Sequence, residues 1–239
     1  DSQHLPTKNC RTVFKDSWGG LWIGTSGGGL LKYGRSSIKS YNGNKGLEGK
    51  YIYTVAASQD SGIWVSTNAR KLYKLNKNKF VEYGVNQNIY PQKIKAILDD
   101  SKGRLWIGTE GSGLTVWKEG KSKNYKSRKY LESKFIKDII EDKEGNIWVA
   151  TSSGISKFSS DLSNVQFFSV KNQNIHYNRV TALMCDRSNR IWYSTRGKGI
   201  GCISDTGLIK MSTKEGLSDN TIRDIAEDDL GNMYLATAD

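Results

Sequence analysis

Apolar residues in this chain fall in short runs separated by polar, glycine-containing turns, and this arrangement recurs at a nearly fixed interval. Each copy has a β-branched apolar segment, an acidic turn and a second apolar segment with one large aromatic residue, and in four copies a Gly-containing loop follows. The marker aromatic residues follow one another at intervals of 42, 42, 42, 44 and 42 residues: Trp22, Trp64, Trp106, Trp148, Trp192 and Tyr234. A period of this length is typical of repeat architectures.

Each complete copy predicts four short antiparallel strands and no helix. Residues nine and twelve positions before the marker are apolar, which predicts a first strand buried on both faces. Cys10 holds the earlier position in the first copy, so we expect it to be a small buried side chain. Six positions before the marker stands a turn aspartate in five copies, and Ser58 in the other: Asp16, Asp100, Asp142, Asp186 and Asp228. Gly or Asn follows three positions later in those five copies, which indicates a hairpin.

Two further short strands complete each copy, so the chain is predicted to be all-β, a β-propeller of four-stranded blades of about 42 residues. We expect one propeller segment over residues 1–239, with blades near 10–50, 51–92, 93–134, 135–178 and 179–220 and a partial blade at 221–239. About five and a half blades suggest a piece of a larger propeller. The marker aromatic residues and turn aspartates are interpreted as structural, because the aromatic residue recurs in every copy and the aspartate in all but one.

Composition narrows the possible chemistry. The net charge is +12, from 36 Lys and Arg against 24 Asp and Glu, and this favours an acidic partner. Three cysteines and two distant histidines, His4 and His176, give no metal-ligand spacing, so no metal or cofactor is expected. No pair of carboxylates stands out from the repeat, so no catalytic residue is predicted. No apolar run has the roughly 20 residues needed to cross a membrane.

Binding residues are sought where the copies differ. Eleven positions before each marker, at the start of the innermost strand, stand mostly cationic residues: Arg11, Tyr53, Lys95, Lys137, Thr181 and Arg223. We expect them to circle the mouth of a central channel as an anion-attracting funnel. Loops on the same face add further candidates: Arg70, Arg179, Arg196 and Lys198, with Tyr90 and His176 among them. The alternative is that these side chains turn sideways and pair with carboxylates such as Asp138 and Asp224.

Two segments carry a resemblance to a known family. "ESKFIKDIIEDKEGNIWVATSSGISKF" (132–158) and "GLSDNTIRDIAEDDLGNMYLAT" (216–237) resemble the two-component regulator propeller repeat. The resemblance implies the periplasmic sensor region of a hybrid two-component system, mainly of Bacteroidetes, with an oligosaccharide as ligand. It further implies neighbouring propeller and β-sandwich domains, a membrane anchor and a kinase elsewhere in the parent chain, and a homodimeric receptor.

Three functions therefore stay open. The first is a sensor for an oligosaccharide, which the charge suggests is acidic. The second is a propeller that docks another protein without a small ligand, and the third is a propeller lyase or glycosidase. Binding to nucleic acid is not expected, because the basic and aromatic residues form no recognisable motif.

Overall fold

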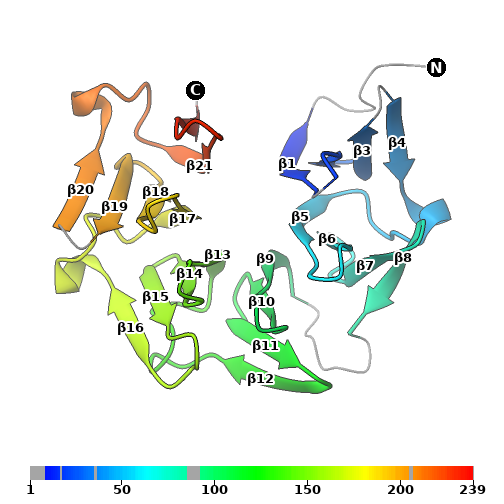
Figure 1. The fold of residues 1–239 in the computed structure, drawn as a ribbon, viewed down its shortest axis with the longest axis horizontal. Coiled ribbons are helices and arrows are strands. Elements are labelled where there is room, and N and C mark those ends of the chain that lie inside the picture. Colours follow the sequence, from blue (N-terminus) through cyan, green and yellow to red (C-terminus); the bar gives the residue numbers. More distant parts are fainter. Residues whose placement is uncertain (1–8, 17, 35–36, 85–91, 205–206, 239) are drawn as a thin grey trace. The chain divides into compact units, whose positions relative to one another are not determined.

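The computed structural model describes residues 9–16, 18–34, 37–84, 92–204 and 207–238, and in this part of the chain the structure is all-β (Figure 1). Its helical residues lie in three single 3-10 turns, η1 (Gly43–Lys45), η2 (Val170–Asn172) and η3 (Thr213–Glu215). No helix among these residues is long and apolar enough to cross a membrane. The chain divides into two compact units, residues 1–107 with 115–123 and residues 108–114 with 124–239.

The first unit holds two complete sheets and most of a third. The first has the order β1 (Cys10–Lys15), β2 (Leu21–Thr25), β3 (Leu30–Gly34), β4 (Ser37–Tyr41). The second is β5 (Ile52–Ala57), β6 (Ile63–Thr67), β7 (Leu72–Asn76), β8 (Lys79–Tyr83). The third is β9 (Ile94–Asp99), β10 (Leu105–Thr109), β11 (Leu114–Lys118), β12 (Lys121–Tyr125). Each first strand packs on the first strand of the next sheet, β1 on β5 and β5 on β9.

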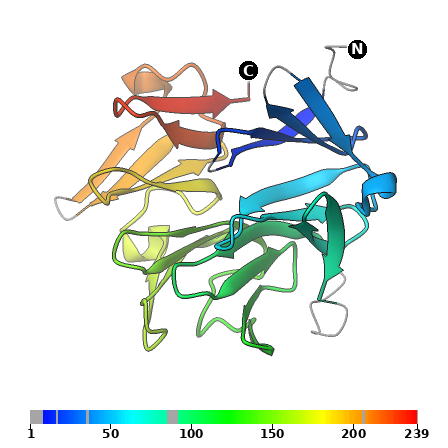
Figure 2. The ribbon, with the colours of Figure 1, turned by 45° about the vertical axis from the view of Figure 1, so that its right-hand side comes forward.

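The second unit repeats this plan. One sheet is β13 (Ile136–Glu141), β14 (Ile147–Thr151), β15 (Gly154–Phe158), β16 (Val165–Phe168). The next is β17 (Val180–Cys185), β18 (Ile191–Thr195), β19 (Ile200–Ser204), β20 (Gly207–Met211). The last described strands, β21 (Ile222–Glu227) and β22 (Met233–Thr237), form a two-stranded sheet, the red pair in Figure 2. The predicted all-β propeller architecture with four-stranded antiparallel blades is confirmed.

The turn aspartate explains why the marker aromatic residue recurs six positions later. Asp100 has no exposed surface, accepts hydrogen bonds from the backbone N–H of Arg104 at 2.8 Å, and accepts another from Trp106 Nε1 at 2.7 Å. The carboxylate thus closes the hairpin and holds the indole of the following strand. The same indole-to-carboxylate bond forms in three other blades, at 2.9 Å for Trp22, 2.8 Å for Trp148 and 2.9 Å for Trp192.

A cation covers each of these indole rings and pairs with the same aspartate. Lys32 and Lys157 supply it from the third strand of their blades, with Nζ 4.7 and 4.8 Å from the ring centroids. Arg104 and Arg190 supply it from the turn itself, with the guanidinium carbon 5.5 and 5.6 Å from the centroid. Much of the basic excess close to the turns is therefore part of the scaffold.

The second blade has Ser58 in place of the turn aspartate, and a residue from the next blade substitutes for it. Asp99, at the end of β9, accepts from Trp64 Nε1 at 3.1 Å and from Ser58 Oγ at 2.9 Å. Lys74 still covers the Trp64 ring, with Nζ 4.8 Å from the centroid.

Cys10 departs from its expected burial: its side chain is exposed. The residues at the same place in later blades, Ile52 and Ile94, are fully buried, and Ile52 packs beside Gly24 of the preceding blade. In the first unit no described sheet precedes β1, so nothing covers Cys10 in the same way.

Candidate functional site

A backbone irregularity sets the direction of the predicted channel residues. Cys10 pairs with Thr25 and Thr12 with Gly24, so Arg11 is an extra residue opposite two consecutive partners. The same register shift brackets Tyr53, Lys137 and Arg223 in their blades. Bulges of this kind re-aim one side chain out of the regular alternation of the strand. In these four blades the repeat therefore supplies one specially directed side chain, at a position where the copies differ.

In the first unit, cations from three segments meet at one aromatic ring. The Arg11 guanidinium carbon lies 5.5 Å from the centroid of the Tyr53 ring. Lys95 Nζ lies 5.1 Å and Lys93 Nζ 5.8 Å from the same centroid. Arg11 also donates from Nη1 to Ser26 Oγ at 3.3 Å. Three cations from three segments thus surround one half-buried tyrosine, here named the Tyr53 cluster (Arg11, Tyr53, Lys93, Lys95).

This arrangement is suited to binding an anion. Each cation–π contact is worth about 0.5–1 kcal/mol at an exposed site, which offsets part of the repulsion among three like charges. Positive charges attract a carboxylate or sulfate, and arginine presents a planar pair of donors to such a group. Lys93 directly precedes β9, and the structure places it beside Arg11 and Lys95, two of the residues predicted to line the channel mouth.

In the second unit, the carboxylates that sequence reasoning offered as alternative partners bind backbone groups. Asp138 accepts from the N–H of Ile139 and of Leu183, both at 2.8 Å. Asp224 accepts from the N–H of Ile225 at 2.9 Å. Burial, and to a lesser extent the charge of Asp224, raises the pKa of Asp138 to about 6, against the lowering effect of the two backbone hydrogen bonds. Among the described residues neither carboxylate forms an ion pair, so Lys137 and Arg223 are not held by them.

The predicted loop residues of the second unit form two contacts. Arg196 donates its backbone N–H to the carbonyl of Arg179 at 3.1 Å, which brings these two exposed residues together. His176 bridges the buried Tyr193 hydroxyl, 2.6 Å from Nδ1, and the carbonyl of Lys198, 2.9 Å from Nε2. Burial lowers the pKa of His176. Lys198 and His176 line a hollow of about 500 Å³ together with Lys210, Lys214 and Asn220.

The remaining candidate residues belong to neither of these groups. Arg70 lies exposed in the turn between β6 and β7 with a φ of 60°, and its N–H donates to the carbonyl of Thr67. His4 and Tyr90 lie outside the described residues. Within the described part of the chain, no group of three or more His, Cys, Asp or Glu side chains is placed to hold a metal ion.

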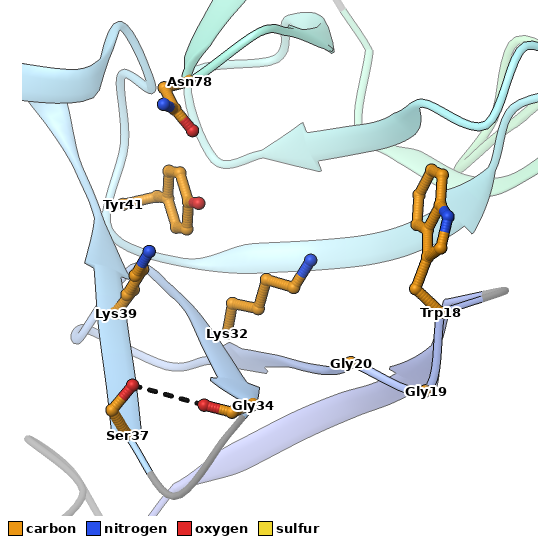
Figure 3. Close-up of a pocket in the computed structure, with 9 residues that line it drawn as sticks. All are labelled: Trp18, Gly19, Gly20, Lys32, Gly34, Ser37, Lys39, Tyr41 and Asn78. Atoms are coloured by element: carbon orange, nitrogen blue, oxygen red, sulfur yellow. Dashed lines mark hydrogen bonds between the residues drawn. The ribbon is translucent and has the colours of Figure 1, made fainter.

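Sequence reasoning missed a groove at the turns of the first two blades (Figure 3). Its volume is about 400 Å³, and Trp18, Lys32, Lys39, Tyr41 and Asn78 line it. Trp18 and Tyr41 stand at opposite ends with Lys32 between them. The sequence does contain a hint of this groove. The chain has seven tryptophans, and only five of them are markers, which leaves Trp18 and Trp117 without a role in the repeat. We name this the Trp18 groove.

Comparison with known proteins identifies the repeat. A family model described as two component regulator propeller matches residues 4–27, 91–111, 130–153 and 216–239. No curated protein matches the chain.

Solved structures share the fold at low identity. The extracellular domain of BT3049 from B. thetaiotaomicron, assigned to the hybrid two-component systems, is 22% identical with a TM-score of 0.84, over 97% of this chain and 33% of that one. The extracellular domain of BT4673 from the same organism is 22% identical with a TM-score of 0.75, over 95% and 34%.

Virginiamycin B lyase from Staphylococcus aureus, solved with quinupristin, is 15% identical with a TM-score of 0.77, over 98% and 79%. At these identities the likeness concerns the fold alone, and the chain spans about a third of the length of the two Bacteroides domains. The four matched segments each include the turn and the strand that follows it, so the family model recognises this turn-and-strand unit in four of the repeats.

Proposed function

We propose that this chain is an extracytoplasmic, periplasmic ligand-sensing propeller of a two-component receptor, and that it binds an acidic oligosaccharide. The observation that carries the ligand class is the Tyr53 cluster, where Arg11, Lys93 and Lys95 surround one tyrosine ring. Cations supply the attraction for carboxylate or sulfate groups, and an aromatic ring offers a flat apolar surface to a sugar. The match to the repeat family and the extracellular two-component domains of the same fold support the sensor role.

In this proposal the propeller does no chemistry. It changes its contacts when the oligosaccharide binds, and the other propeller and sandwich domains of a homodimeric parent receptor pass that change to a kinase. Because a lyase has the same fold, an enzymatic function is the alternative, and the binding experiment includes an assay for turnover of the ligand.

The test is calorimetric titration of the 239-residue chain with an acidic oligosaccharide, using Arg11→Gln, Lys95→Gln and the control Lys121→Gln. Lys121 is an exposed residue of β12, so its loss removes the same charge from another place. Loss of one contacting cation costs about 1 kcal/mol, which is about a 5-fold weaker Kd. Equal affinities for all four proteins would refute the Tyr53 cluster as the site. Cleavage of the oligosaccharide would instead favour a lyase or glycosidase, and absence of binding would favour a protein-docking scaffold.

A further inference from the structure

The Trp18 groove has a feature that the scaffold does not require. Trp18 lies two residues after the turn aspartate of the first blade, and its side chain is 68% exposed. The other five blades have smaller or polar residues at this place: Asp60, Lys102, Glu144, Ser188 and Leu230. The turn therefore forms without a tryptophan. A single exposed aromatic residue is ordinary on a protein surface. Whether Trp18 belongs to a binding site therefore depends on the residues around it.

The far end of the groove is a rigid apolar wall. Tyr41 is only 7% exposed, and its ring packs against Trp22 at 5.3 Å and Phe80 at 5.6 Å between centroids. These contacts hold the tyrosine in place before any ligand arrives, which lowers the entropic cost of binding. Asn78, in the turn between β7 and β8, adds an amide donor and acceptor from the second blade.

The charge of the groove is positive and only partly compensated. Lys32 and Lys39 are directly opposite each other on β3 and β4, an arrangement that repulsion disfavours. Lys32 is neutralised by Asp16 Oδ2 at 2.8 Å, whereas the structure shows no partner for the exposed Lys39 among the described residues. Hollows that share Tyr41 and Asn78 add Lys45 and Lys77. The nearby Asp60 already pairs with Lys74 at 2.7 Å.

We propose that the Trp18 groove is a second carbohydrate subsite, which holds one negatively charged sugar unit, a uronate or a sulfated residue. The sugar ring stacks on Trp18, its acid group meets Lys39, and its hydroxyl groups face Asn78. Aromatic faces bind the C–H surface of a sugar ring, and the lysine adds a charge-assisted bond to its acid group. A volume of about 400 Å³ is sufficient for such a unit. This inference takes its ligand class from the proposed function, but its residues are different.

The optical properties of Trp18 provide the test. The five marker tryptophans are buried, so acrylamide should quench Trp18 far more readily than those five. The difference between the intact chain and Trp18→Phe isolates the Trp18 signal. The probes are digalacturonic acid, lactose as a neutral disaccharide, and sodium sulfate as a bare anion. We expect digalacturonic acid to protect Trp18 from quenching, and the other two probes to protect it at least about 5-fold less well at equal concentration.

Variants separate this groove from the Tyr53 cluster. Lys39→Gln should weaken the protection about 5-fold, and Lys121→Gln and Arg11→Gln should leave it within about 2-fold. Because Lys39 is an exposed strand residue, its replacement should preserve the fold. Quenching that digalacturonic acid does not change, or protection that lactose or sulfate provides equally, would overturn the proposal. Loss of protection in Arg11→Gln would mean that the Tyr53 cluster alone binds the sugar.

Discussion

Replacing one turn aspartate tests how the blades are stabilised. Asp100 is fully buried and binds the indole N–H of Trp106, the backbone N–H of Lys102 at 3.0 Å, and the backbone N–H of Arg104. Its carboxylate also forms an ion pair with the Arg104 side chain, which is itself buried. The change Asp100→Ala removes the acceptor for all of these donors at once and leaves a buried guanidinium without its counter-charge.

The expected cost follows from burial. Removing one partner of a buried ion pair costs about 3–5 kcal/mol, because the remaining charge stays away from water. Asp228 is the matched control: it has the same turn position, accepts from Leu230, Asn232 and the Tyr234 hydroxyl, and lies in a turn that is largely exposed. Tyr234 is 59% exposed, so water replaces the lost bonds and Asp228→Ala should cost only about 1 kcal/mol.

Urea unfolding, followed by tryptophan fluorescence, measures both costs. With a slope of about 2 kcal/mol per molar urea, Asp100→Ala should lower the midpoint of its transition by about 2 M and Asp228→Ala by about 0.5 M. Equal shifts would refute the conclusion that buried turn aspartates stabilise the blades through their indole and guanidinium partners.

Three further changes have defined outcomes. Gly201→Ala places a Cβ 2.3 Å from Cζ of the buried Tyr193 and should cost about 2 kcal/mol in urea, whereas Gly34→Ala, whose Cβ meets nothing within 4 Å, should cost under about 0.5 kcal/mol. Asp99→Ala should lower the free energy of unfolding by about 2 kcal/mol, because Trp64 and Ser58 both lose their acceptor. An unchanged urea midpoint would contradict the conclusion that Asp99 takes the role of the missing turn aspartate. The raised pKa of Asp138, about 6 against 3.8, means that the folded chain holds a proton that the unfolded chain has released between about pH 4 and 6. Stability should therefore fall as pH rises through this window, and comparison of urea midpoints at pH 4.5 and 7 should show a smaller fall for Asp138→Asn.

The fold was predictable because each repeat contains the residues that form its own turn and position its own marker indole. The turn aspartate and the indole six residues later form one local unit, and sequence spacing detects local units. Asp99 takes the role of the turn aspartate that is missing at Ser58. This was not predictable, because the two residues are 41 positions apart and belong to different blades. The exposure of Cys10 was likewise missed, since its burial depends on a neighbouring blade and not on its own strand.

The candidate site was predictable only in part. Arg11, Tyr53 and Lys95 share one position of the repeat, and a bulge at that position directs Arg11 and Tyr53 toward a common surface. The Trp18 groove could not be assembled from the sequence, because a turn, two strands of one blade and a turn of the next all contribute to it.

The most direct test of the proposed function is calorimetric titration of the chain with an acidic oligosaccharide and a neutral one of equal length, at about 0.05 and 0.5 M salt. Screening lengths shrink severalfold over this range, so contacts between exposed charges weaken. The proposal predicts that the acidic ligand binds more tightly and loses about 10-fold in affinity at the higher salt. Equal binding of both ligands, or binding that salt does not change, would contradict it.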